Sequence, residues 1–95
     1  MFNFQNQTVI VTGGNGSIGR AIGLAFAQAG AQVVLIGRNE VKGQQSVQLL
    51  AEQGYEASFY AVDLSDAQHV ENFYTRFKQA FSTFNVLINC AGACL

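Results

Sequence analysis

Four short apolar runs rich in β-branched residues recur along this 95-residue chain, and no other feature restricts its fold as strongly. They occupy residues 8–12, 31–37, 57–62 and 85–89, and few polar side chains interrupt them. Runs of this kind are typical of strands that are covered on both faces, as in parallel sheets. The chain is therefore expected to place four strands in the interior of one small layered domain.

The segments between the runs have the spacing of amphipathic helices. The first stops at Gly30, and the second covers about residues 39–53 and stops at Gly54. The third begins with Ser65 followed by Gln68, the pattern of a capping box. Apolar stripes are predicted in the first helix at Ile18, Ala21, Ile22, Ala25, Phe26 and Ala29, in the second at Val47, Leu50 and Ala51, and in the third at Val70, Phe73, Phe77 and Phe81. We interpret the aromatic stripe as core rather than as a cofactor site.

Strands that alternate with helices of this length indicate right-handed parallel crossovers, and hence a doubly wound α/β fold. The Rossmann-type strand order would be 3-2-1-4, with a dinucleotide crossing the carboxyl ends of the strands where this order reverses. Only residues 90–95 follow the fourth strand, so its outer edge has no predicted neighbour. Because an unpaired apolar edge favours association, we expect a homo-oligomer formed through this edge or through exposed apolar surface.

Composition argues against several other classes of protein. Only 12% of the residues are charged and the mean hydropathy is +0.19, so more apolar surface is expected than a small fold hides. No apolar run has the ~20 residues of a membrane helix and no signal peptide is recognisable, so the cytoplasm is the expected location. A net charge of −1 without a basic cluster predicts no nucleic-acid binding. Cys90 and Cys94 have the spacing of neither a redox pair nor a zinc site, and His69 is the single histidine, so no metal is expected.

The first strand leads into the glycine-rich stretch VTGGNGSIGRA at residues 11–21. Gly14, Gly16 and Gly19 satisfy the G-x-G-x-x-G spacing between a predicted strand and a predicted helix. Glycines let a pyrophosphate approach the main chain, and the helix N-terminus supplies unpaired amides and the positive end of a dipole. Dinucleotide binding is the favoured interpretation, and a plain tight turn is the alternative. A triphosphate-binding P-loop is excluded because no lysine follows the glycines.

The end of the second predicted strand bears on which dinucleotide would bind. In NAD-binding folds an acidic residue about twenty positions further on holds the ribose hydroxyls. Positions 36–38 read Ile-Gly-Arg and contain no carboxylate. Arg38 can instead offer a planar, permanently charged group to a 2′-phosphate and stack on the adenine. NADP(H) is therefore favoured over NAD(H), with a solvated surface arginine as the alternative.

Three separated motifs resemble those of the short-chain dehydrogenase/reductase family, in its NADP(H)-using form. TGGNGSIG at residues 12–19 resembles the family's T-G-x-x-x-G-I-G loop, with Ser17 in place of the middle glycine. VDLSD at residues 62–66 resembles the end of the family's third strand. FNVLINCAG at residues 84–92 resembles the N-N-A-G motif, with Cys90 in place of the second asparagine.

The resemblance implies a cofactor site that is spread over the strand ends. Asp63 is expected to contact the adenine ring, and Gly16 stands where many NADP(H)-using members carry a second basic residue. The preference for NADP(H) would then rest on Arg38 alone. The implied cofactor-binding residues are Gly13, Asn15, Gly16, Ser17, Ile18, Gly19, Arg38, Asp63, Leu64, Asn89, Ala91 and Gly92.

The resemblance also implies that residues 1–95 are the N-terminal dinucleotide-binding portion of an oxidoreductase that transfers hydride between a nicotinamide and a carbonyl or alcohol. The family's catalytic Ser, Tyr and Lys lie downstream of the N-A-G motif, so no catalytic residue is assigned and the chain by itself is expected to be inactive. Tyr74 and Lys78 have the family's Y-x-x-x-K spacing but precede the fourth strand, and we interpret them as a chance match. Two alternatives stay open, a non-catalytic module that binds a dinucleotide or self-associates, and an inactive truncated remnant.

Overall fold

The computed structural model describes residues 4–13, 17–81 and 84–89. Within them strands and helices alternate as the apolar runs predict, in the order β1 (Thr8–Thr12), α1 (Ser17–Gln28), β2 (Gln32–Gly37), α2 (Glu40–Glu52), β3 (Ala57–Ala61), α3 (Ala67–Ala80) and β4 (Val86–Asn89). All strand pairs are parallel, and the order across the sheet is β3-β2-β1-β4. The predicted doubly wound α/β fold with strand order 3-2-1-4 is confirmed.

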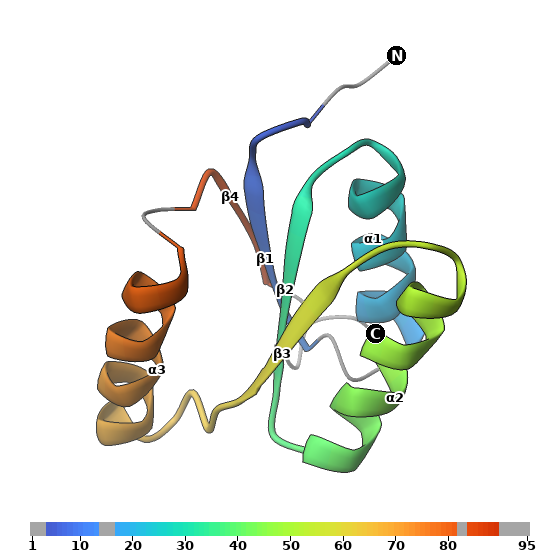
Figure 1. Ribbon diagram of the computed structural model, residues 1–95. Helices are drawn as coiled ribbons and strands as arrows, with labels where there is room; N and C mark the ends of the chain where they lie inside the picture. Colours follow the sequence, from blue (N-terminus) through green and yellow to red (C-terminus); the bar gives the residue numbers. More distant parts are fainter. Residues whose placement is uncertain (1–3, 14–16, 82–83, 90–95) are drawn as a thin grey trace.

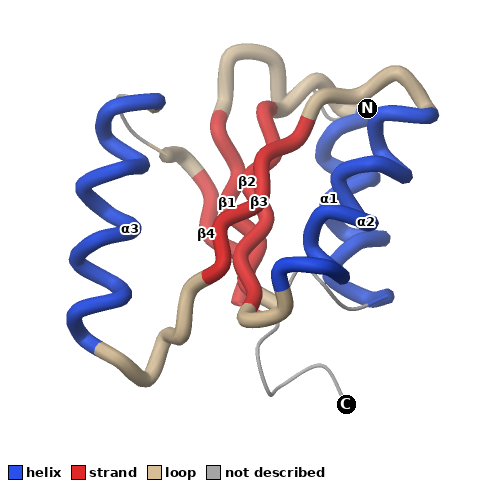
Figure 2. Tube along the Cα trace, turned by 60° about the horizontal axis from the view of Figure 1, so that its bottom comes forward, coloured by secondary structure: helices blue, strands red, loops and turns tan. Residues whose placement is uncertain are grey.

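The fold has three layers, with α1 and α2 on one face of the sheet and α3 on the other (Figure 1 and Figure 2). β1 lies between β2 and β4, and its Val9 is in register with Val33 and Val86. All five residues of β1 are buried. Since neighbouring side chains of a strand point to opposite faces, an uninterrupted apolar strand in this position supplies both cores at once.

Two apolar clusters result, one on each face of the sheet. The cluster on the side of α1 and α2 consists of Val9, Val11, Ala27, Val33, Leu35 and Leu50. The cluster on the side of α3 consists of Ile10, Val34, Ile36, Val62 and Phe77. Successive residues of β1 and β2 thus alternate between the clusters, as the pleat of a strand requires.

α1 packs on the sheet through a face that differs in part from the predicted stripe. The stripe residues divide into two groups, the partly buried Ile22, Phe26 and Ala29 and the exposed Ile18, Ala21 and Ala25. Gly19 and Gly23 are buried in their place, and a Cβ on Gly23 would lie 3.1 Å from Leu35 Cδ2. The glycines let the helix come close to the sheet, and a stripe defined by apolar side chains leaves them out.

α2 also contacts the sheet through a glycine. Gly43 is buried, and a Cβ placed on it would overlap the ring of Phe59 in β3. Leu50, two turns further along, is buried on the same side, whereas Ala51 of the predicted stripe is exposed. The helix is capped by Asn39, which agrees with the predicted start.

α3 covers its face of the sheet with aromatic rings, as predicted. Phe77 is only 2% exposed, and its ring centroid lies 5.6 Å from that of Phe73 and 5.0 Å from that of Phe81. Tyr60 of β3 meets Phe73 edge-on with centroids 5.1 Å apart. Val70, the first residue of the predicted stripe, is 38% exposed. The stripe therefore belongs to the core from Phe73 onward.

The predicted capping box at the start of α3 is wrong by one residue. The N-cap is Asp66, whose carboxylate accepts hydrogen bonds from the amides of Gln68 and His69. Ser65 donates to Asp63 instead. A carboxylate caps a helix as well as a hydroxyl does and also interacts favourably with the helix dipole, so Asp66 takes the position.

β4 is less covered than its apolar sequence predicts. Val86 and Ile88 are partly buried on the side of α1 and α2, but Leu87 on the other face is 55% exposed. The cluster under α3 is built on the other three strands. The expectation of a strand covered on both faces is therefore wrong for β4 in the described residues.

Candidate functional site

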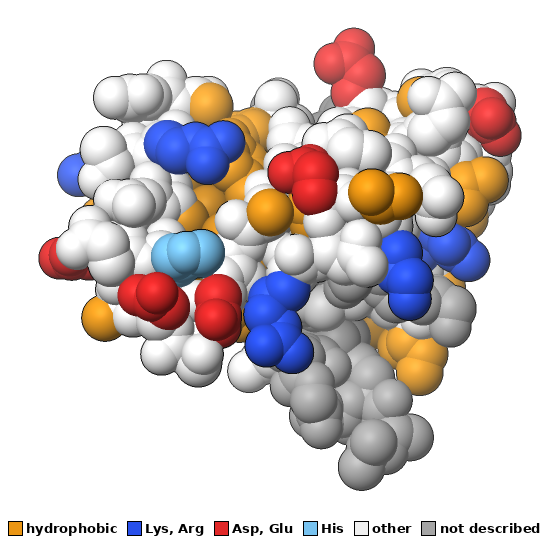
Figure 3. All heavy atoms as spheres, turned by 90° about the horizontal axis from the view of Figure 1, so that it is seen from below, with side chains coloured by type: hydrophobic (Ala, Val, Ile, Leu, Met, Phe, Trp, Pro, Cys, Tyr) orange, Lys and Arg blue, Asp and Glu red, His pale blue; other side chains and the backbone are white. Residues whose placement is uncertain are grey.

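The carboxyl ends of the parallel strands meet at one edge of the sheet, at the bottom of Figure 1. Figure 3 views this edge directly and shows the histidine beside acidic side chains, with a basic side chain next to them. Two groups of residues lie at the strand ends. We call them the charged half, which is Arg38, Asp63, Ser65, Asp66 and His69, and the neutral half, which is Thr12, Gly13 and Asn89.

In the neutral half, a hydrogen bond joins the ends of β1 and β4. Thr12 Oγ1 lies 2.8 Å from Asn89 Oδ1 and 3.3 Å from the carbonyl oxygen of Ile88. Thr12 is buried and Asn89 is exposed. The threonine hydroxyl therefore orients the Asn89 side chain at the place where the strand order reverses, which is where open α/β sheets bind ligands.

The glycine-rich loop of the neutral half begins with a turn that favours glycine. Gly13 has a φ of +75°, in the left-handed region. Residues 14–16 lie outside the described part of the chain, and α1 begins at this edge with Ser17 and has no acidic residue in its first turn (Figure 1). Gly19 is buried, and Ile18 beside it is 48% exposed. The first turn of α1 thus places no carboxylate of its own where an anion could approach the amides.

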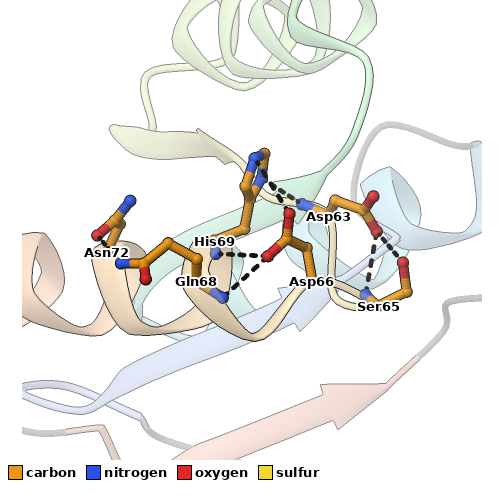
Figure 4. Close-up of polar contacts among 6 residues, drawn as sticks. All are labelled: Asp63, Ser65, Asp66, Gln68, His69 and Asn72. Carbon is orange, nitrogen blue, oxygen red and sulfur yellow. Dashed lines mark hydrogen bonds and ion pairs between the residues drawn. The ribbon is translucent and has the colours of Figure 1, made fainter.

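In the charged half, Ser65 holds the carboxylate of Asp63. Asp63 Oδ1 accepts hydrogen bonds from Ser65 Oγ at 2.6 Å and from Ser65 N at 3.0 Å (Figure 4). These two hydrogen bonds lower the pKa of Asp63 from its usual value, and the charge of Arg38 lowers it further. Asp63 is therefore an ionised hydrogen-bond acceptor at neutral pH.

Asp66 and His69 attach the same loop to α3. Asp66 Oδ1 lies 2.9 Å from the amide nitrogen of Gln68 and 3.4 Å from that of His69. His69 Nδ1 in turn accepts the amide of Asp63 at 3.2 Å, and its Nε2 lies 4.0 Å from Asp66 Oδ2 (Figure 4). Hydrogen bonds therefore connect Asp63, near the start of the loop, with the first turn of the helix.

Arg38 lies where the sequence predicts, exposed and directly after β2. Its charge acts on Asp63, so the ends of β2 and β3 form one electrostatic environment. Glu40 is the first carboxylate after β2, and its Oε2 accepts a hydrogen bond from Gln44 Nε2 at 2.7 Å. This hydrogen bond directs the Glu40 side chain along α2.

The predicted site residues that the structure describes lie together. They occupy the strand ends or the first turn of α1 and comprise Gly13, Ile18, Gly19, Arg38, Asp63, Leu64 and Asn89. The other predicted positions fall outside the described residues, namely Asn15, Gly16, Ala91, Gly92 and the side chain of Ser17.

Sequence reasoning missed four residues of this edge, Thr12, Ser65, Asp66 and His69. Thr12 is the first residue of the glycine motif, so its place in the motif was the available signal. Ser65 and His69 follow Asp63 by two and six residues. A turn and the first turn of a helix bring such neighbours back to the aspartate, and polar residues just after it were the signal.

Other features that could have formed a site lie elsewhere or are not found. Tyr74 and Lys78 are in the second half of α3, away from the carboxyl edge, with Lys78 Nζ 5.2 Å from the tyrosine ring centroid (Figure 1). The described residues include no group of three possible metal ligands. None of the helices in those ranges is long and apolar enough to cross a membrane.

Known proteins resemble this chain along nearly its whole length. The profile of the family described as short chain dehydrogenase matches residues 7–94. A 3-oxoacyl-[acyl-carrier-protein] reductase FabG from Chlamydia trachomatis is 41% identical over 88 residues, which are 92% of this chain and 36% of that protein. A 3beta-hydroxysteroid dehydrogenase from Mediterraneibacter gnavus is 33% identical over 92 residues, which are 97% of this chain and 33% of that protein.

The fold is likewise similar to solved structures. The crystal structure of a metagenomic short-chain oxidoreductase in complex with NADP matches with a TM-score of 0.82 at 32% identity, covering 88% of this chain and 38% of that one. The chain spans about a third of the length of these relatives. The similarity therefore concerns the part of each relative that matches this chain.

Proposed function

The chain belongs to the short chain dehydrogenase family, and on that basis we propose that it forms the dinucleotide-binding part of an oxidoreductase that prefers NADP(H). One observation carries the proposal. The charged and neutral halves share the carboxyl edge of a sheet whose order reverses between β1 and β4. In open α/β sheets this is the place where dinucleotides bind.

The described residues suit the successive parts of such a cofactor, in the order in which these residues lie along the edge. The turn at Gly13 and the amides that begin α1 suit a pyrophosphate. The ionised Asp63 suits the amino group of adenine, which is a hydrogen-bond donor, and Asn89, whose amide can donate and accept hydrogen bonds, suits the nicotinamide end. The bound cofactor supplies the hydride chemistry, while these residues bind and orient it.

Arg38 is the reason for preferring NADP(H) over NAD(H). It is exposed at the end of β2, and no carboxylate stands at positions 36–38 to pair with ribose hydroxyls. A guanidinium group forms charge-assisted hydrogen bonds with the 2′-phosphate that only NADP(H) carries.

The proposed reaction of the whole protein is hydride transfer between the nicotinamide and a carbonyl or alcohol substrate. Similarity to a 3-oxoacyl reductase and to a 3beta-hydroxysteroid dehydrogenase supports this reaction class. We assign no described residue as catalytic, because the residues at the edge suit binding and orientation. The proposed role of residues 1–95 is therefore to hold the cofactor.

An Arg38→Asp variant tests the binding proposal. Wild-type protein should bind NADPH more tightly than NADH. The variant replaces attraction for the 2′-phosphate with repulsion and should weaken NADPH binding by about 30-fold or more, equivalent to ~2 kcal/mol, with little change for NADH. Fluorescence titration of the reduced cofactors measures both.

Lys78→Asp makes the same charge change on α3, away from the edge, and should leave both affinities unchanged. Equal losses for NADPH and NADH in Arg38→Asp would contradict the NADP(H) preference. Failure of the wild type to bind either cofactor would contradict dinucleotide binding itself.

A second candidate function is self-association through β4, favoured by the exposure of Leu87. This side chain is 55% exposed on an edge strand of the described sheet, a combination that favours pairing with another chain. Leu87→Lys should lower the mass measured by sedimentation equilibrium. Tyr74→Lys, at a side chain that is 54% exposed on α3, is the matched control. An unchanged mass in Leu87→Lys would contradict association through this strand.

A further inference from the structure

The contacts of His69 connect it to the part of the site that we propose for adenine. Its Nδ1 accepts the amide hydrogen of Asp63 at 3.2 Å, and its Nε2 lies 4.0 Å from Asp66 Oδ2 (Figure 4). The Asp63 amide belongs to the residue whose carboxylate would meet the adenine. The imidazole therefore fixes the backbone from which that carboxylate projects.

Only one protonation state of the ring allows this contact. Nδ1 accepts a hydrogen bond when it carries no proton, so the neutral ring holds its proton on Nε2, on the side of the Asp66 carboxylate. A protonated imidazole has a donor on both nitrogens. The Nδ1 proton would then face the amide proton of Asp63, and the hydrogen bond would be lost.

We propose that His69 is a positioning residue for the cofactor, which in its neutral form holds Asp63 in place for the adenine and on protonation releases it, so that cofactor binding weakens in acid. This role rests on the proposed dinucleotide-binding function. Among the side chains, histidine is the one whose ordinary charge change falls between pH 5 and 8.

The expected effect is a partial loss of affinity, because the other contacts of the loop do not use the ring. Ser65 still donates to the Asp63 carboxylate, and the cap at Asp66 is made by backbone amides. The charged groups around the ring are the carboxylates of Asp63 and Asp66, and Arg38 acts on the same Asp63. One neutral hydrogen bond corresponds to a change of about 3- to 10-fold.

Two substitutions separate the hydrogen bond from the charge. His69→Asn places a side-chain oxygen near the position of Nδ1, where it accepts the Asp63 amide without titrating. His69→Leu occupies similar space and offers no acceptor. NADPH dissociation constants are measured by fluorescence at pH 8 and pH 5.5 for the wild type and both variants. The 2′-phosphate also gains a proton over this interval, but equally for all three proteins.

Between pH 8 and pH 5.5 the wild type should lose about 3- to 10-fold more affinity than His69→Asn, the range given by one hydrogen bond. At pH 8 His69→Asn should match the wild type, and His69→Leu should be weaker by a similar factor. Equal pH dependence in the wild type and His69→Asn would overturn the proposal. So would wild-type affinity in His69→Leu at pH 8.

A measurement on the free protein distinguishes this proposal from the proposed function. The hydrogen-exchange protection factor of the Asp63 amide, followed by NMR, should fall on acidification in the wild type and stay constant in His69→Asn. Constant protection in both would overturn the contact. A normal amide response without NADPH binding at pH 8 would overturn the proposed function, and with it the role of His69 in binding.

Discussion

The two halves of the carboxyl edge are built from contacts of different range. In the charged half, the hydrogen-bond partners of Asp63 are Ser65, Asp66 and His69, at most six residues along the chain. In the neutral half, the hydrogen bond joins Thr12 and Asn89, which are 77 residues apart. The local hydrogen bonds can form as soon as the loop folds. The hydrogen bond between Thr12 and Asn89, in contrast, exists only when β1 and β4 are paired. The hydrogen bonds of the charged half therefore depend on local sequence and protonation, with Arg38 brought to Asp63 by the pairing of β2 and β3, and the hydrogen bond of the neutral half depends on the assembled sheet.

Under the proposed function, the two halves contact different parts of the cofactor. Arg38 in the charged half would meet the phosphate that distinguishes NADPH from NADH. Gly13 and Asn89 in the neutral half would meet parts that both cofactors share. Changes in the charged half should then alter cofactor preference or pH dependence, and changes in the neutral half should affect both cofactors equally.

The largest effect shared by both cofactors is expected at the turn after β1. Gly13 and Gly54 have φ values of +75° and +90°, so alanine at either position should cost about 1–2 kcal/mol of unfolding free energy. Gly13→Ala should also weaken NADPH and NADH binding at least about tenfold, because the added Cβ and the shifted turn keep the pyrophosphate from the main chain. Urea unfolding and cofactor titration measure the two effects.

Gly54→Ala is the matched control, since a Cβ there has no atom within 4 Å and the residue follows α2. It should lose stability and keep its cofactor affinity. If Gly13→Ala also keeps its affinity, the turn after β1 does not approach a ligand, and the neutral half has no part in binding.

The sequence predicts the fold and the strand ends because both follow from local patterns. Apolar β-branched runs give the strands, helical spacing gives the crossovers, and the parallel arrangement brings all carboxyl ends to one edge. Arg38 and Asp63 could be located for this reason, since each directly follows a run or lies at its end. Their charge and chemistry could then be read from the residue type.

The parts that were missed depend on competition between groups in three dimensions. Ser65 and Asp66 can both cap a helix, and Asp66 does so because the Asp63 carboxylate binds Ser65. The exposure of Leu87 depends on how far the rings of α3 reach across the sheet, which spacing does not define. The bond from Thr12 to Asn89 requires the register of β1 and β4.

A smaller effect is expected from Thr12→Val, which removes the hydrogen bond between the ends of β1 and β4. Loss of one hydrogen bond should lower the unfolding free energy by ~1 kcal/mol and weaken NADPH and NADH binding by the same few-fold factor, because the Asn89 side chain is no longer oriented. Thr75→Val removes an exposed hydroxyl that donates to the Glu71 carbonyl within α3 and should change neither affinity. A selective loss of NADPH binding in Thr12→Val would contradict the division between the halves.

The smallest effect is expected from Ser65→Ala in the charged half, and it should depend on pH. The fold lowers the pKa of Asp63 below its usual 3.8, chiefly through the Ser65 hydroxyl. At pH values above 3.8 the ionised carboxylate therefore stabilises the fold. This contribution is lost as the pH falls through the lowered pKa. Removing the hydroxyl should therefore reduce the unfolding free energy at pH 7, and this reduction should become smaller as the pH falls below 3.8 and Asp63 gains its proton. Urea unfolding across this pH range measures the change, and Ser58→Ala in β3 is the control, whose effect should stay constant. A pH-independent loss in Ser65→Ala would mean that Ser65 supports the loop without acting on the Asp63 charge.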